Sequence, residues 1–269
     1  DKDIISTVGT TNIMLGGGGD NILSAVGTTN LMQANEGDDI ISAAGATNVL
    51  VAGDGDNIVT AIGSNNKAIA GDGDDIITAL GGQNVVLGGD GDNTVTLAGG
   101  SNVGITGAGN DTLTTLGHTN INVTGAGNDI ATAVGKNNAV LAGDGNDIVT
   151  TAGKLNAVAA GSGDDIVTLA GMNNLALGDA GDDIITIIGK VNMAMGGSGD
   201  DTIMGAGKSN YLLGGSGDDI VVAAGQKNDI AGDSGFDILI VAGKENKVYG
   251  DVNHTLPDVS FNAPPLPSV

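Results

Sequence analysis

The chain has 269 residues, 49 of them Gly, and carries 32 Asp and Glu against 9 Lys and no Arg, a net charge of −23. This charge argues against nucleic-acid binding, which relies on Lys and Arg to neutralise phosphates. The lack of Cys excludes disulfides, and the 40% apolar content excludes an acidic disordered chain. No apolar run approaches the ~18 residues of a membrane span, and the first residues do not form a signal peptide, so we expect a mature, processed or partial chain.

A repeat of 18 residues runs from Lys2 to Asp251 without insertion or deletion. The first half of each unit reads G-x-G-[DN]-[DN]-I-[IV]-T, and the second half reads G-x-x-N followed by mostly apolar residues. The second-half Gly recurs fourteen times from Gly9 to Gly243, and the Asn three residues later recurs fourteen times from Asn12 to Asn246. A fixed period of this kind predicts a stacked repeat architecture in which neighbouring coils bury a common core.

In chain order, each unit gives a Gly-rich turn, a short strand, a second turn and a second strand. Gly supplies the positive φ of tight turns, and Ile, Val and Thr favour strands. We therefore predict an all-β solenoid of about 14 coils over residues 1–251. Stacked at the strand spacing of ~4.8 Å, such coils would form a rod roughly 65 Å long.

The alternation of side chains along a strand sorts them into inward and outward sets. In the strand Ile76–Leu80 we expect Ile77 and Ala79 to point inward, because a narrow coil needs small residues near its turns. Apolar columns would then face outward on both walls, with a Thr column from Thr60 to Thr186 beside one of them. The opposite parity would make these residues core. The outward columns are Ile58, Ile76, Ile130, Ile148 and Ile166 on one wall, and Leu87, Ile105, Val123 and Leu141 on the other.

Nearly all acidic residues fall in the first turn of the repeat, so folding would stack carboxylates in columns along one edge. Most Lys residues lie at the other turn and cannot relieve this repulsion. Ca²⁺ takes six to eight oxygen ligands, which Asp side chains and the carbonyls of Gly-rich turns supply, whereas no His/Cys cluster favours another metal. One ion between each pair of neighbouring turns would give about 13 ions. A solvated acidic edge that keeps the protein soluble is the alternative. The candidate metal ligands are Asp20, Asp38, Asp39, Asp56, Asp74, Asp75, Asp92, Asp111, Asp129, Asp147, Asp164, Asp165, Asp182, Asp183, Asp200, Asp201, Asp218, Asp219 and Asp237.

The segment Gly88–Thr96 resembles the nonapeptide G-G-x-G-x-D-x-U-x of RTX (hemolysin-type) proteins, and Gly214–Val222 matches it fully, with Asp219 at the motif Asp. The resemblance implies a right-handed parallel β-roll with Ca²⁺ between successive turns, and a protein that is secreted unfolded and folds in extracellular Ca²⁺. It implies ligand roles for the motif aspartates, which are Asp39, Asp75, Asp111, Asp129, Asp147, Asp165, Asp183, Asp201 and Asp219.

The second half of each repeat departs from the family pattern, because it carries G-x-x-N in place of the motif. There the Asn column, as at Asn66, Asn84 and Asn102, predicts an amide ladder along the second edge. We therefore expect ions on one edge only.

Beyond the repeat, residues 252–269 hold all four Pro and predict a non-repeat cap or linker, since Pro cannot continue a strand ladder. The repeat begins within a turn and without a capping segment, which favours a fragment or head-to-tail stacking. No catalytic role is expected, because His118 and His254 lie far apart in the repeat and no nucleophile motif is present.

Three functions fit these patterns. The first is a secreted, Ca²⁺-stabilised structural protein that self-assembles into a filament, sheath or surface layer, and we favour it because apolar outward columns and missing caps suit assembly. The second is an ice-binding protein that uses a flat Ile/Thr face. The third is a Ca²⁺-folding module of a larger adhesin, toxin or protease. The expected partners are further copies of the chain, ice or a cell surface.

Overall fold

The structure is a computed structural model that describes residues 2–250. The predicted tail at 252–269 and His254 lie outside the described residues. The chain divides into two compact units, residues 1–126 and residues 127–269. Both consist of parallel strands whose partners are 18 residues apart, so the predicted all-β solenoid with about 18 residues a coil is confirmed.

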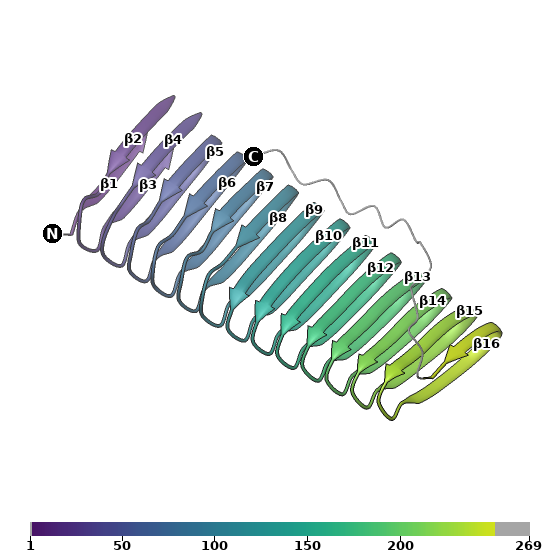
Figure 1. Cartoon of the computed structure of the whole chain (residues 1–269). Coiled ribbons are helices and arrows are strands. Elements are labelled where there is room, and N and C mark those ends of the chain that lie inside the picture. Colours follow the sequence, from purple (N-terminus) through teal and green to yellow (C-terminus); the bar gives the residue numbers. More distant parts are fainter. Residues whose placement is uncertain (1, 251–269) are drawn as a thin grey trace. The chain divides into compact units, whose positions relative to one another are not determined.

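The first unit holds seven coils, seen in the purple-to-teal part of Figure 1. Its first two coils contain two short strands each, and every later coil is one longer strand. The pairing is in register along the unit, as shown by Ile58 opposite Ile76 and Asn66 opposite Asn84. The strands are β1 (Ile4–Val8), β2 (Thr11–Leu15), β3 (Ile22–Val26), β4 (Thr29–Gln33), β5 (Ile40–Val51), β6 (Ile58–Ile69), β7 (Ile76–Leu87), β8 (Thr94–Ile105) and β9 (Thr112–Ala126).

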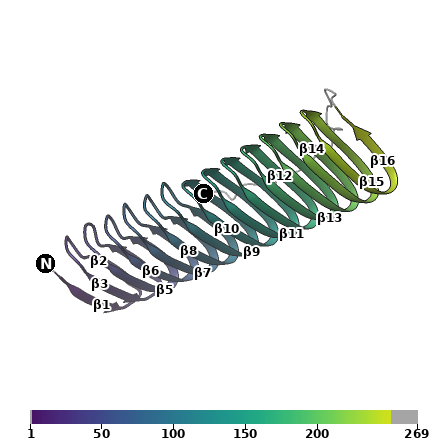
Figure 2. The ribbon, with the colours of Figure 1, turned by 90° about the horizontal axis from the view of Figure 1, so that it is seen from below.

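The second unit also holds seven coils, each a single strand with the same 18-residue register. Figure 2 shows the parallel coils of β10 to β16 following one another along this unit. The strands are β10 (Ile130–Asp144), β11 (Ile148–Ser162), β12 (Ile166–Ala180), β13 (Ile184–Ser198), β14 (Thr202–Ser216), β15 (Ile220–Ser234) and β16 (Ile238–Tyr249).

The second turn differs from the prediction, because from β5 onward the strand runs through G-x-x-N instead of stopping there. Its glycines stay in the ladder, as Gly45 opposite Gly63 shows, and they do not have the positive φ expected of a tight turn. Gly is required there by close approach: a Cβ on Gly63 would collide with the carbonyl oxygen of Gly45. Among the residues that the structure describes, positive φ is confined to the first turn, as at Gly73 with φ 135°.

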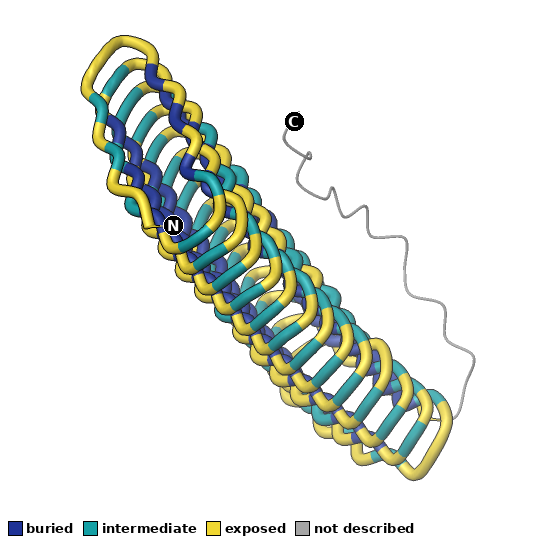
Figure 3. Tube along the Cα trace, turned by 90° about the vertical axis from the view of Figure 1, so that its left-hand side faces the viewer, coloured by how far each residue is buried: buried dark blue, intermediate teal, exposed yellow. Residues whose placement is uncertain are grey.

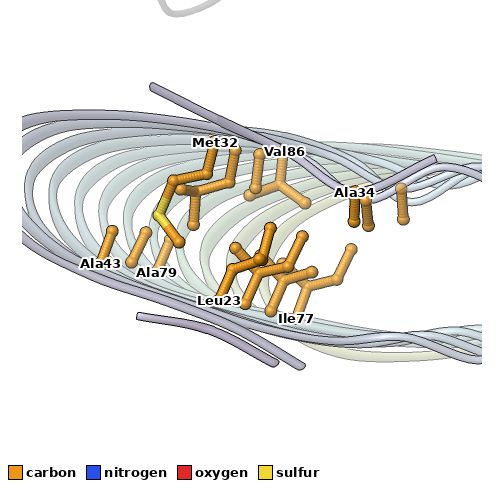
Figure 4. Close-up of a cluster of buried hydrophobic side chains, with 14 of the residues drawn as sticks. Leu23, Met32, Ala34, Ala43, Ile77, Ala79 and Val86 are labelled. Carbon is orange, nitrogen blue, oxygen red and sulfur yellow. The ribbon is translucent and has the colours of Figure 1, made fainter. Parts of the chain in front are cut away.

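The predicted parity is confirmed, because Ile77 and Ala79 are fully buried and Ile76 is 52% exposed. Figure 3 shows buried and exposed positions alternating along each coil. In the first unit, Leu23 and Ile77 on one wall of the coils point toward Met32 and Val86 on the other wall (Figure 4). The second unit has its own core, with Val149, Val167, Ile185, Ile203 and Leu212 all at most 1% exposed. Within a coil each core consists only of the few inward side chains of its two walls, so a coil depends on its neighbours for burial.

Within residues 2–250, the structure contains no helix that is long and apolar enough to cross a membrane.

Candidate metal-binding edge

The paired Asp and Asn positions of the first turn occupy two different environments. The residue directly before the outward Ile or Thr of the strand points inward and is buried, whereas the residue before it is exposed. Just before β7, for example, Asp75 is buried and Asp74 is exposed. Each turn therefore contributes one side chain to an inner column and one to an outer column. This sorting arises because the inward and outward alternation of side chains along the strand continues through the two residues that precede it.

The outer column consists of exposed side chains, mostly aspartates, that accept hydrogen bonds from backbone amides of the next coil. The amide of Asp74 donates to Oδ1 of Asp56 at 2.9 Å, and the amide of Asp92 donates to Oδ1 of Asp74 at 2.7 Å. The same bond joins Asp182 to Asp164 at 2.9 Å in the second unit. These carboxylates are already hydrogen-bonded and solvated. The predicted ligands in this column are Asp20, Asp38, Asp56, Asp74, Asp92, Asp164, Asp182, Asp200 and Asp218.

The inner column consists mostly of buried aspartates, and these accept hydrogen bonds from backbone amides of the preceding coil. Oδ1 of Asp165 accepts the amide of Asp147 at 2.7 Å, and Oδ1 of Asp183 accepts the amide of Asp165 at 2.9 Å. The second oxygen, Oδ2, has no hydrogen-bond partner in Asp39, Asp75, Asp147, Asp165, Asp183, Asp201 and Asp219, although these residues are at most 1% exposed. The remaining predicted ligands of this column are Asp111 and Asp129, which are buried, and Asp237, which is half-buried.

Burial shifts the ionisation of the inner carboxylates. Loss of solvent raises the pKa of Asp75, Asp147, Asp165, Asp201 and Asp219 from the ordinary 3.8 to about 6. The pKa of Asp183 rises to about 7, and neighbouring carboxylates add to the effect of burial at each of these sites. Bonds from backbone amides lower these pKa values, and the side chain of Asn57 also lowers that of Asp75, but by less than burial raises them. An inner column without a counter-charge is therefore unfavourable at neutral pH.

A cation fits the chemistry of this column. A buried carboxylate oxygen without a hydrogen-bond donor lacks a positive partner, which a cation would supply. The main-chain carbonyls of the surrounding Gly-rich turn are further oxygen ligands for such a cation. Among residues 2–250, no three acidic or His side chains converge closely enough to hold a metal by themselves. Carbonyl oxygens would therefore have to complete the ligand set of each ion, as Ca²⁺ coordination allows.

Three residues of the inner column are Asn instead of Asp, and the sequence interpretation did not separate them from the outer residues. They are Asn21, Asn57 and Asn93. Nδ2 of Asn57 donates to the carbonyls of Gly53 and Gly55 at 2.9 and 2.7 Å. The signal was available, because these residues directly precede the outward Ile or Thr just as Asp75 does.

The opposite edge carries the predicted amide ladder, which is confirmed. In the first unit Nδ2 of Asn66 donates to Oδ1 of Asn84, and Nδ2 of Asn84 donates to Oδ1 of Asn102, both at 2.8 Å. In the second unit Asn156 and Asn174 are joined in the same way at 2.8 Å. Each amide also reaches a backbone carbonyl of the next coil, as Asn84 does with Ala98 at 3.1 Å. The polar groups of this edge satisfy one another without an ion.

The RTX calcium-binding nonapeptide repeat model matches residues 24–59, 60–95, 97–131, 195–230 and 205–239. The chain belongs to the RTX calcium-binding nonapeptide repeat family. A second model, the C-terminal repeat from RTX toxins, matches residues 124–140, 142–158, 160–176, 178–195 and 234–249. Searches of curated proteins and of solved structures found no match.

Membership of the RTX family makes calcium binding a property of the repeat type, and RTX repeats occur in secreted proteins. The RTX repeat is a structural repeat and not a catalytic fold. His118 is an exposed residue of the strand β9.

Proposed function

We propose that this RTX chain is an extracellular structural solenoid that Ca²⁺ stabilises through the inner Asp column of its first turns. The observation that carries the proposal is the row of buried Oδ2 atoms without hydrogen-bond donors. A cation on these atoms would remove the desolvation penalty of the carboxylates and the repulsion between successive coils.

The inner column would make folding depend on Ca²⁺ concentration. Where Ca²⁺ is scarce, as inside a cell, the buried carboxylates oppose folding, and where it is abundant, as outside the cell, binding favours the folded state. A single site that is filled at 100 times its Kd adds about 2.7 kcal/mol, and several sites add up. The chain could then be exported unfolded and fold after export.

Circular dichroism of the full chain in EGTA and in millimolar Ca²⁺ tests this role. We expect the β-sheet signal to fall in EGTA and to return when Ca²⁺ is added in excess, while Mg²⁺ restores less because it demands a smaller octahedral site. A spectrum that is unchanged by EGTA would contradict the proposal.

We also propose that the folded solenoid self-associates through its outward apolar columns. In the first unit Ile58 and Ile76 are 44% and 52% exposed, and on the other wall Leu87 is 39% exposed. In the second unit Ile148, Ile166 and Ile184 form a similar column, each at least 44% exposed. A continuous exposed apolar stripe is typical of an interaction surface.

Analytical ultracentrifugation in Ca²⁺ tests the association. We expect higher oligomers for the natural chain and mainly monomer for the triple variant Ile148→Lys, Ile166→Lys, Ile184→Lys, since charges would enter the interface. A matched control replaces Lys136, Lys154 and Lys190 of the second turn with Gln and should leave association unchanged. A monomeric natural chain that inhibits ice recrystallisation would instead favour the ice-binding alternative.

A further inference from the structure

The composition of the inner column differs between the two units. In the first unit it alternates between amide and acid, and in the second unit it is acidic in every coil. The first-unit order is Asn21, Asp39, Asn57, Asp75, Asn93 and Asp111. The second-unit order is Asp129, Asp147, Asp165, Asp183, Asp201, Asp219 and Asp237.

Each inner Asn closes its own turn. Nδ2 of Asn93 donates to the carbonyls of Gly89 and Gly91 at 3.0 and 2.9 Å, as Nδ2 of Asn57 does in its turn. Nδ2 of Asn21 likewise donates to the carbonyls of Gly17 and Gly19. The amide thus supplies positive hydrogens to the two carbonyls that lie four and two residues before it.

An inner Asp presents an oxygen at the place where an inner Asn presents that amide. A Cβ on Gly196 would collide with Oδ2 of Asp201, and a Cβ on Gly16 would approach Nδ2 of Asn21 to 3.0 Å, so both terminal atoms lie under the first Gly of their turn. The turn backbone is alike in both cases, with φ of 122° at Gly55 and 127° at Gly199. A carboxylate oxygen cannot donate to these carbonyls, so a turn with an inner Asp needs another positive group. In the first unit the side-chain amides of Asn21 and Asn57 act on the neighbouring Asp39 and Asp75 and lower their pKa, whereas the second unit has no inner amide and needs a cation.

We propose that Asn21, Asn57 and Asn93 take the place of Ca²⁺ in the first unit, so that the calcium requirement for folding is confined to the second unit. This inference rests on the proposed calcium role of the inner Asp column. It adds that the first unit folds without the ion and that the second unit does not.

The charges between neighbouring coils support this division. Every space between consecutive inner residues from Asn21 to Asp111 is bounded by one carboxylate and one neutral amide. Seven consecutive Asp residues from Asp129 to Asp237 instead bound six spaces, each with two carboxylates. Two carboxylates favour a divalent cation more strongly than one, and the Asn amide already occupies its turn's carbonyls. We therefore expect about six strong Ca²⁺ sites instead of about 13.

Hydrogen–deuterium exchange of the full chain, read peptide by peptide in Ca²⁺ and in EGTA, tests the division. We expect backbone amides of β5–β8 to stay protected in both conditions, and those of β11–β15 to lose protection at least 100-fold in EGTA. Loss of protection in both units would overturn this inference while leaving the calcium role intact. Protection kept in both units would overturn the calcium role itself.

Reciprocal variants sharpen the test. The triple variant Asn21→Asp, Asn57→Asp, Asn93→Asp should make protection of β5–β8 depend on Ca²⁺, and added Ca²⁺ should restore it. Its control is Asn110→Asp, which adds an acid to the exposed outer column and should leave protection of β5–β8 in EGTA unchanged. The double variant Asp165→Asn, Asp201→Asn should restore part of the protection of β12–β14 in EGTA. If the triple variant stayed protected without Ca²⁺, the inference would fail.

Discussion

Asn and Asp have nearly the same shape, yet at the inner position of the first turn Asn donates hydrogen bonds, whereas Asp needs a donor or a cation. The amide of Asn57 donates to two turn carbonyls, whereas Oδ2 of Asp165 has no donor. On the second edge Asn84 uses the same amide chemistry between coils. A single nitrogen or oxygen atom therefore determines whether a turn closes on itself or needs a cation.

Because the Asn side chains of the second edge form a continuous ladder, we expect the loss of one amide to lower the free energy of unfolding markedly. Asn84→Leu would leave the amide of Asn66 and the acceptor oxygen of Asn102 without their partner. A buried polar group left unpaired costs about 1–3 kcal/mol, so we expect the free energy of unfolding in Ca²⁺ to drop by at least about 2 kcal/mol. Urea unfolding followed by circular dichroism measures this change.

The control for this substitution lies one residue earlier on the same bend. Gln83 is exposed, and Gln83→Ala should change the free energy of unfolding by less than about 0.5 kcal/mol. Equal effects of the two substitutions would show that the ladder contributes no more than a surface position.

At the scale of the element, the inner Asp column links stability to pH in the calcium-free chain. The pKa of Asp147, Asp165 and Asp201 rises from 3.8 to about 6 on folding, and that of Asp183 rises to about 7. The folded state thus binds more protons than the unfolded state between about pH 4 and pH 7, so the free energy of unfolding falls as the pH rises through this range.

Thermal unfolding in EGTA should show this trend. We expect the transition that belongs to the second unit to lie about 5 °C or more higher at about pH 4.5 than at about pH 7.5. In saturating Ca²⁺ the trend should disappear or reverse, because protons then compete with the ion. If the unfolding temperature of the calcium-free chain increased as the pH rises, the inner carboxylates could not be buried and unpaired.

The element scale also shows what the sequence could predict. The 18-residue period and the inward parity of Ile77 and Ala79 were enough for the solenoid and its core, because both follow from strand alternation and stacking. The strand that continues through the bend at Gly63 was not predicted, because the close approach of Gly63 to Gly45 of the preceding coil depends on three-dimensional packing. The distinct environments of Asp74 and Asp75 were missed, because strand parity was not extended into the turn.

At the scale of the whole molecule, one repeat produces two units with different chemistry on the first edge. The second edge is the same in both, with the Asn ladder continuous within each unit. The apolar outward columns are also common to both units. Calcium dependence is therefore expected to vary along the chain, while the surface offered for association does not.

Calcium-anomalous diffraction from crystals of the full chain grown in millimolar Ca²⁺ would locate ions on the inner Asp column of the second unit. We expect anomalous peaks on the first-turn edge, beside Oδ2 of the inner residues Asp147, Asp165, Asp183, Asp201 and Asp219, and none on the Asn ladder. Peaks between the G-x-x-N bends, or an inner Asp column without peaks, would contradict the proposed calcium role.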